Sequence, residues 1–241
     1  MKIVEAFSKF AYEYNKYNVI QKEVAKKLTS FLKRNSYGKI LDLGSGDGEI
    51  YKNLEKKNIK FKRFVALDFS DEMLTLHPTS ESVKKICSDF NHISCFSNFK
   101  DNEFDLLISS SALQWSEDLL STFSHISKLS SECYFSFFTS DTFKTLHRTA
   151  NITSPIYPKD TILEVLDKIF IYEFEVEKYR LEFNSVHEML RYIKRSGVSG
   201  GVEQLNYRQM RALMLNYPLT YLEFEVLFVK IRSKRENNLS Q

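Results

Sequence analysis

Three glycines occupy alternate positions in the sequence LDLGSGDGE, directly after a short apolar run. Gly44, Gly46 and Gly48 have no side chains, so a bound molecule can approach the main chain closely here. A helix that begins after the loop adds its free N–H groups and the positive end of its dipole. Open α/β sheets bind nucleotides at the carboxyl ends of their strands, where such loops lie. The spacing therefore predicts a nucleotide-binding loop centred on these glycines.

Acidic residues around this loop restrict the type of nucleotide. A dinucleotide-binding fingerprint has the spacing G-x-G-x-x-G/A, but Glu49 stands where the last small residue is needed. Asp42 in the preceding run and Asp47 in the loop add negative charge, which favours a cationic ligand over a pyrophosphate. S-Adenosylmethionine, with its sulfonium and α-amino groups, is such a ligand, and we predict it as the cofactor. An NAD-dependent oxidoreductase is the alternative from another reaction class.

Two further aspartates follow the next two apolar runs. Asp68 lies at the end of FVALDF, where an acid can accept hydrogen bonds from both ribose hydroxyls. Asp89 follows VKKICS and can accept from the adenine amino group. Capping of the helix that follows at Ser70 is the structural alternative for Asp68, and a structural role is equally open for Asp89. Asp42 has its own alternative, which is hydrogen bonding to the amides of the loop.

The elements that must position these residues alternate along the first part of the chain. Apolar residues at helical spacing predict amphipathic helices over residues 18–34 and 118–129. Between and after them, nearly continuous apolar runs predict buried strands at 39–44, 64–69, 83–88, 104–110 and 133–139. Buried strands that alternate with helices are typical of a parallel sheet covered on both faces. The sequence therefore predicts a doubly wound α/β fold.

The pattern changes after about residue 140. Residues 170–183 alternate between apolar and polar side chains, which predicts a half-exposed, antiparallel strand. Ser185 and Asn206 each precede a Glu or Gln by three residues, so each can cap a helix. Residues 221–232 read as a final long strand. We expect a helical insertion between two long strands.

Composition excludes several classes of function. The chain has 241 residues, of which 43% are hydrophobic, and a net charge of +3, which gives no bulk electrostatic case for nucleic-acid binding. Cys87, Cys95 and Cys133 form no CxxC pair and have no zinc-ligand spacing, so we expect reduced thiols and no metal. Charged residues interrupt every apolar stretch, which argues against a signal peptide or a membrane span. We expect a cytoplasmic protein.

Several blocks, taken in order along nearly the whole chain, are similar to a known family. LDLGSGDG resembles the first motif of class I S-adenosylmethionine-dependent methyltransferases. The blocks AFSKFAYEYNKYNVIQKEVAKKL, ALDFSDEML, SSSALQWSEDL and YPLTYLEFEVLF resemble the malonyl-[acyl-carrier protein] O-methyltransferases of biotin synthesis. Asp47 replaces the proline, and Ser45 the cysteine, that are frequent in the loop of that family. Both departures leave the glycines and the acids in place.

The resemblance implies a single domain over residues 1–241, with a mostly parallel, seven-stranded, Rossmann-like sheet. Its parts would be an N-terminal helical lid at 1–36, a cofactor-binding core at 37–140, substrate-side helices with a long strand at 141–217, and the last strand at 218–235. The implied reaction methylates the free carboxylate of a malonyl group on acyl carrier protein or coenzyme A. A methyltransferase of another small acid or of a phenolic metabolite is the alternative. A carboxylate is ionised at neutral pH, so the reaction requires no general base.

The resemblance also suggests site residues. For the malonyl carboxylate we predict Arg191 and then Lys194, on the polar face of the insertion helix, although a solvated face is the alternative. Walls of the site are Tyr14, Gln114 and Trp115, the last of which can also be a core anchor. The residues predicted to contact the cofactor are Tyr14, Gln21, Asp42, Gly44, Ser45, Gly46, Gly48, Asp68, Phe69, Met73, Asp89, Phe90 and Ser110. An acidic carrier protein needs a basic rim, for which the candidates are Lys144, His147 and Arg148, or the insertion helix.

Overall fold

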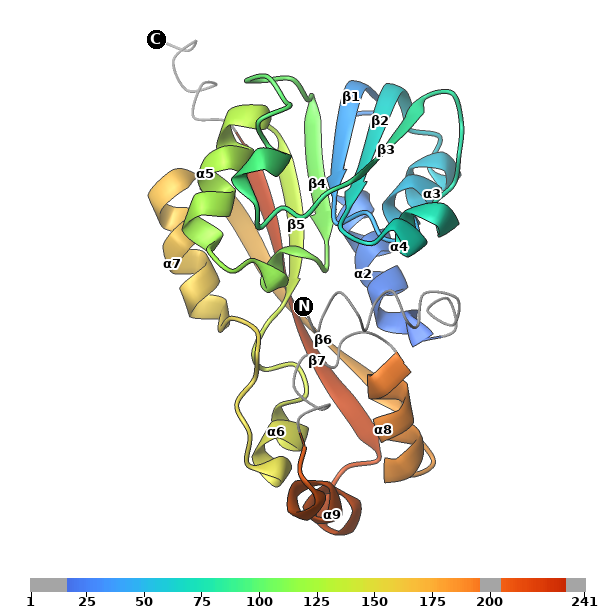
Figure 1. Ribbon diagram of the computed structural model, residues 1–241, viewed down its shortest axis with the longest axis vertical. Helices are drawn as coiled ribbons and strands as arrows, with labels where there is room; N and C mark the ends of the chain where they lie inside the picture. Colours follow the sequence, from blue (N-terminus) through green and yellow to red (C-terminus); the bar gives the residue numbers. More distant parts are fainter. Residues whose placement is uncertain (1–16, 196–204, 233–241) are drawn as a thin grey trace.

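A seven-stranded sheet organises the protein (Figure 1). The computed structural model describes residues 17–195 and 205–232. The sheet has the strand order β3-β2-β1-β4-β5-β7-β6, in which the first five strands of the chain are parallel and β7 is antiparallel to both of its neighbours. The strands are β1 Ser36–Leu43, β2 Lys60–Asp68, β3 Val83–Cys87, β4 Leu106–Ser110, β5 Cys133–Phe138, β6 Ile171–Glu182 and β7 Tyr221–Arg232. The predicted seven-stranded, mostly parallel fold is confirmed.

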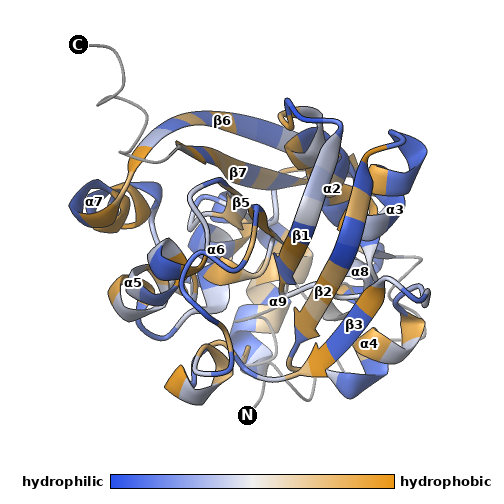
Figure 2. Ribbon diagram, turned by 90° about the horizontal axis from the view of Figure 1, so that it is seen from above, coloured by the Kyte–Doolittle hydropathy of each residue, from blue (hydrophilic) through white to orange (hydrophobic). Residues whose placement is uncertain are grey.

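Helices cover both faces of the sheet. Seen from above, α2 and α3 lie on one side and α5 and α7 on the other (Figure 2). The helices are α2 Val19–Ser30, α3 Glu49–Lys56, α4 Asp71–Leu76, α5 Leu119–Leu129, α6 Lys144–Ala150, α7 Lys159–Ile169, α8 Val186–Arg195 and α9 Tyr207–Asn216, with short 3₁₀ turns η1 Ile93–Cys95 and η2 Leu113–Trp115. In the part of the chain that the structure covers, no helix has the length and apolarity to cross a bilayer.

The apolar strands contribute side chains to two hydrophobic cores, one on each face of the sheet. Successive side chains of a strand point to opposite faces, so Ile40 joins the cluster under α2 and α3, and Leu41 joins the cluster under α5 and α7. Leu106 and Leu107 of β4 divide in the same way. This is why the strands read as continuous apolar runs in the sequence.

Several predicted boundaries differ from the observed ones, and the differences are largest at α2 and β2. Helix α2 ends at Ser30 rather than near residue 34, because the Phe31 N–H bonds back to the Leu28 carbonyl at 3.2 Å and the Phe31 ring packs edge-on against Phe228. Strand β2 begins at Lys60 rather than at Phe64. Its polar first residues still pair with the start of β1, where one end of the sheet meets solvent.

Strands β6 and β7 extend beyond the other strands. Residues 226–231 of β7 pair with β5, whereas residues 221–225 pair with β6 alone. Helices α6, α8 and α9 lie around this extension (Figure 1). The predicted caps are present, because the Ser185 hydroxyl accepts from the Glu188 N–H at 3.1 Å and Asn206 forms a full capping box with Gln209. The prediction of a helical insertion between two long antiparallel strands is confirmed.

Candidate functional site

The glycine loop joins β1 to α3 at the carboxyl end of the sheet. All three glycines have positive φ, of 75°, 53° and 85° for Gly44, Gly46 and Gly48, so the loop needs conformations that other residues rarely adopt. The N–H groups of Gly44 and Ser45 donate to the Leu67 carbonyl at 2.8 and 2.9 Å, which ties the start of the loop to β2. Helix α3 begins directly after Gly48, as predicted.

The three glycines meet different surroundings. A Cβ on Gly44 would lie 2.2 Å from the Cβ of Ala112, so the loop passes close to the end of β4. A Cβ on Gly48 would lie within 3.0 Å of His77 and Pro78, which means that protein packing accounts for this glycine. Gly46 has more room, with the Met73 Cε at 3.5 Å. Gly44 and Gly46 line a cavity, and Gly48 does not.

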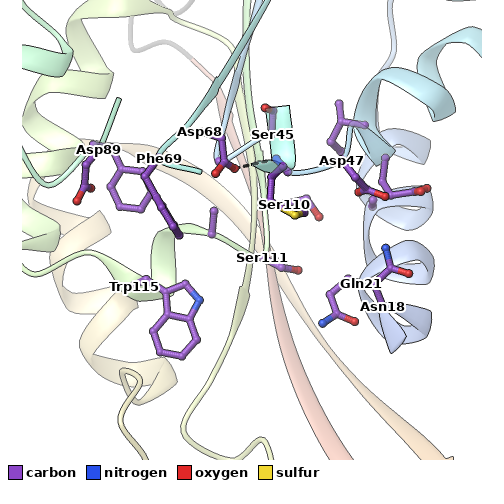
Figure 3. Close-up of a pocket in the computed structure, with 18 of the residues that line it drawn as sticks. Asn18, Gln21, Ser45, Asp47, Asp68, Phe69, Asp89, Ser110, Ser111 and Trp115 are labelled. Carbon is purple, nitrogen blue, oxygen red and sulfur yellow. Dashed lines mark hydrogen bonds between the residues drawn. The ribbon is translucent and has the colours of Figure 1, made fainter. Parts of the chain in front are cut away.

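This cavity lies between the glycine loop, the ends of β2 and β4, and helix α2 (Figure 3). In the close-up, Phe69 and Asp89 lie at one side of the cavity, Asn18 and Gln21 at the other, and Asp68 between them. The cavity brings together eleven of the predicted site residues, which are Gln21, Gly44, Ser45, Gly46, Asp68, Phe69, Met73, Asp89, Phe90, Ser110 and Trp115.

Other predicted site residues lie elsewhere. Gln114 is buried and donates to the Ser111 carbonyl at 2.7 Å, so it supports the wall of the cavity and does not line it. Arg191 is exposed on α8 and is not part of the lining. Lys194 lies in the last turn of α8, but its side chain is not described. Tyr14 lies outside the described residues.

Asp68 lines the cavity and connects the glycine loop to the segment after β2. Its Oδ2 accepts from the Gly46 N–H at 2.8 Å and its Oδ1 from the Ser70 N–H at 2.9 Å, while the side chain is only 7% exposed. Ser70 caps α4 through its own hydroxyl, so the capping alternative for Asp68 was wrong. Burial raises the pKa of Asp68 to about 6. Each carboxylate oxygen keeps acceptor capacity for a further donor.

Asp42 differs from both roles predicted for it. It is fully buried, does not line the cavity, and neither carboxyl oxygen has a hydrogen-bond partner among the described residues. Bonding to the amides of the loop, the structural alternative, was therefore wrong. Burial, followed by repulsion from Asp68, raises the pKa of Asp42 well above its usual range. Its carboxyl group therefore does not face a bound ligand in the cavity.

Lys52 partly neutralises the acids at the start of α3. Its Nζ lies 3.2 Å from Asp47 Oδ2 and 3.0 Å from Glu49 Oε1, and both acids line the cavity. The sequence alone suggested two uncompensated charges at this point. Lys52 itself is not part of the lining, where the described side chains include five acids, Asp47, Glu49, Asp68, Asp89 and Glu117, and no lysine or arginine. The cavity therefore still favours a cationic ligand.

Asn18 and Ser111 are cavity residues that the sequence analysis missed. Asn18 is fully buried, and neither atom of its amide has a partner within the described chain. Ser111 follows β4 with a φ of 57°, and its Oγ is likewise without a partner in the structure that we describe. Buried polar atoms are costly when unpaired, so both point to a ligand. No spacing marks Asn18, and Ser111 was hidden within the apolar strand and SSSALQW block. The other lining residues are Ala25, Ile50, Asn91 and Ala112.

These features together fit S-adenosylmethionine. The loop exposes main chain beside Gly44 and Gly46, Asp68 retains acceptor capacity for a sugar, and the lining is acidic. Unpaired amide atoms of Asn18 lie at the side opposite Asp89. An extended ligand with a nucleoside at one end and charged groups at the other matches this distribution.

Comparisons with known proteins support the same conclusion. Residues 41–131 match a family model described as a methyltransferase domain. A malonyl-[acyl-carrier protein] O-methyltransferase of Bacillus cereus is 27% identical over 223 residues, covering 82% of this chain and 80% of the relative. The resemblance seen in the sequence is confirmed.

Two solved structures show the same fold. The YcgJ protein of Bacillus subtilis has a TM-score of 0.62 at 12% identity, covering 88% of this chain and 98% of that one. A Haemonchus contortus N-methyltransferase, in complex with phosphomonomethylethanolamine and S-adenosylhomocysteine, has a TM-score of 0.58 at 15% identity, covering 97% of this chain and 61% of that one. The methyltransferase domain over residues 41–131, the methyltransferase relatives and the shared fold together indicate an S-adenosylmethionine-dependent methyltransferase.

Proposed function

We propose that this methyltransferase methylates the free carboxylate of a malonyl thioester on acyl carrier protein. The observation that carries the proposal is the match to relatives named malonyl-[acyl-carrier protein] O-methyltransferase, one of which is aligned over 92% of both chains at 24% identity. The order and completeness of the matching blocks support it further. The fold alone would not, because one fold hosts many chemistries.

Different residues of the cavity would bind different parts of the cofactor. In this proposal Asp68 accepts hydrogen bonds from the ribose hydroxyls while it keeps its bonds to Gly46 and Ser70. Phe69, Asp89 and Phe90 would hold the adenine, and Asn18 and Gln21 would hold the amino-acid end on the opposite side. Gly44, Ser45 and Gly46 would present main chain to the middle of the ligand.

In the proposed reaction, the protein needs chiefly to position the carboxylate against the methyl group and to exclude water. Bound S-adenosylmethionine supplies an electrophilic methyl group on a sulfonium. The malonyl carboxylate is already an anion at neutral pH, so no general base is needed, and the described lining contains no histidine, cysteine or lysine. Alignment of the carboxylate would supply much of the rate enhancement, since good alignment is worth ~7–11 kcal/mol.

Recognition of the carboxylate stays a prediction. Arg191 on α8 is exposed and forms no ion pair with another described residue, so its guanidinium is available to a substrate. Lys194 is the second candidate on the same helix. Because neither is placed in the described lining, contact with a malonyl group requires that the substrate extend from the cavity toward α8.

Methyl transfer from labelled S-adenosylmethionine tests the proposal. Malonyl-acyl carrier protein should become labelled in a methyl ester that mild base releases, and malonyl-coenzyme A serves as the second acceptor. Labelling of a phenol or of another small acid, with none of either malonyl thioester, would overturn the proposed substrate. A thermal-shift comparison should show stabilisation by S-adenosylhomocysteine and none by NAD.

Replacement of Asn18 should weaken binding of the amino-acid end of the cofactor and leave binding of the nucleoside end unchanged. We expect Asn18→Ala to weaken binding of S-adenosylhomocysteine by about 10- to 100-fold, because hydrogen bonds to charged groups contribute about 1.5–3 kcal/mol. Binding of 5′-methylthioadenosine, which lacks the amino-acid end, should change by less than about twofold. Calorimetric titration of both ligands measures the ratio.

Asn53→Ala is the matched control for this experiment. Asn53 is also a buried amide, but it donates to the Glu49 carbonyl at 2.7 Å and does not line the cavity. This variant should lower the free energy of unfolding and leave the ratio of the two affinities unchanged. Equal losses for both ligands in Asn18→Ala would show that Asn18 does not contact the amino-acid end.

A further inference from the structure

One face of α9 combines positive charge with exposed apolar side chains. Tyr207, Met214 and Leu215 are 80%, 44% and 69% exposed, and Arg208 and Arg211 are exposed beside them. At about 100° per residue these five positions fall on one side of the helix. Leu213, on the opposite side, is fully buried, and α9 packs there against α6. We call the five exposed residues the α9 face.

No residue that the structure describes neutralises the charge on this face. Neither α9 nor the neighbouring helix α6 contains an aspartate or glutamate. Arg208 and Arg211 form no ion pair with any residue that the structure describes. Other cations of the described chain are paired with acids. Lys27 lies against Glu175 and Glu177 on β6, and Lys52 bridges Asp47 of the glycine loop and Glu49 of α3.

The rim first predicted from the sequence is a weaker candidate. His147 is buried, and burial lowers its pKa, so it presents no charge to a partner. Lys144 is held by Asp141 at 2.6 Å. Arg148 alone of those three residues is exposed, and like the arginines of α9 it has no ion-pair partner in the described chain. Arg148 therefore adds to the cationic character of the α6 and α9 pair.

We propose that the α9 face is the docking surface for the acidic carrier protein that brings the substrate. This inference rests on the proposed function. A partner that presents carboxylates together with apolar side chains along a helix would pair with Arg208 and Arg211 and cover Tyr207, Met214 and Leu215. Aromatic and arginine side chains are the types that anchor protein interfaces. A carrier protein delivers its thioester on a flexible prosthetic arm, so its docking surface need not adjoin the cavity.

Charge reversal at Arg208 and Arg211 tests the inference. The variant Arg208→Glu/Arg211→Glu should lower kcat/KM for malonyl-acyl carrier protein by about tenfold or more, chiefly through KM, because rim charges govern encounter and its salt dependence. Its kcat/KM for malonyl-coenzyme A should stay within about twofold of the parent value. Direct binding of the carrier protein to the variant should weaken in parallel, and Glu→Lys changes on the carrier helix should restore part of it.

Lys62→Glu/Arg63→Glu is the matched control. Both residues are exposed near the start of β2, at the end of the sheet opposite the cavity, and the charge change is the same. This variant should keep the parent kinetics with both substrates. Thermal unfolding of both variants checks that the exposed substitutions leave the fold intact.

The remaining outcomes overturn the inference in distinguishable ways. Equal losses with both substrates, or no loss with the carrier protein, would show that the carrier does not dock there. Loss of a dimer on sedimentation of the α9 variant, without a change specific to the carrier, would assign the face to a second copy of the chain. Loss of binding to phosphatidylglycerol vesicles, again without that change, would assign it to a lipid surface. If the parent methylates neither malonyl substrate, the proposed function itself is wrong.

Discussion

Gly44→Ala is expected to lower the free energy of unfolding by about 3 kcal/mol and to abolish detectable binding of S-adenosylhomocysteine. The φ of 75° at Gly44 is unfavourable for alanine, and the added Cβ would lie 2.2 Å from the Cβ of Ala112. Neither group is the end of a flexible side chain, so the loop or the end of β4 must move. Either movement changes the part of the cavity between β1 and β4. Denaturant unfolding and calorimetric titration measure the two effects.

Two companion variants separate the contact from the backbone strain. Gly44→Ala/Ala112→Gly removes the close contact and keeps the unfavourable φ, so about half of the lost stability should return. Gly46→Ala has a similar φ of 53° but only an ordinary contact, with Met73 Cε at 3.5 Å, and should cost about 1–2 kcal/mol. If Gly44→Ala were as stable as the parent, the close approach of the loop to Ala112 would be wrong.

Asp68→Asn is expected to weaken binding of S-adenosylhomocysteine by about 100-fold. The carboxylate accepts from two main-chain N–H groups at once, at Gly46 and Ser70. An amide keeps one oxygen and turns an NH₂ group toward the other N–H, so one of these bonds is lost. Only one oxygen then remains to accept hydrogen bonds from the ribose hydroxyls. The loss should appear with 5′-methylthioadenosine as well, because that ligand keeps the ribose.

The pH dependence of binding gives an independent check on Asp68. Its pKa is raised to about 6 in the free protein, so the side chain takes up a proton as the pH falls from 7 to 5. The ionised form is the better acceptor for two hydroxyls, and affinity for S-adenosylhomocysteine should therefore decrease over this interval. Asp68→Asn should show a shallower decrease. An affinity of the parent protein that is flat between pH 7 and 5 would exclude this role for Asp68.

The sequence was informative wherever local pattern and tertiary structure agree. Buried parallel strands must be apolar on both faces, so β1, β4 and β5 were visible as runs, and Gly44 and Gly48 were visible because their conformations exclude most other residues. The carboxyl ends of parallel strands meet at one edge of a sheet. For that reason Asp68, Asp89 and Ser110, which are far apart in sequence, could be placed at one site in advance.

Side-chain direction and partners were not visible in the same way. Asp42 lies one residue before the end of β1, and the sequence does not reveal that its carboxyl group is fully enclosed rather than turned to the ligand. The neutralising contacts of Lys52 depend on the rotation of α3. Asn18 is recognised only from its burial without partners, which is a property of the packed structure. Arg191 was chosen by its helical face, and that face alone does not establish contact with the substrate.

Strand β6 is the outermost strand of the described sheet, and no strand among the described residues pairs with the outer side of its main chain. Glu173, Glu175 and Glu177 stand at alternate positions along it, two of them held against Lys27. A strand from a second molecule that added to this edge would bring its own side chains beside a row of carboxylates, and in a head-to-head arrangement of two copies these rows would repel each other. The same acids that fasten α2 to the sheet would thereby disfavour the pairing of two copies through this edge.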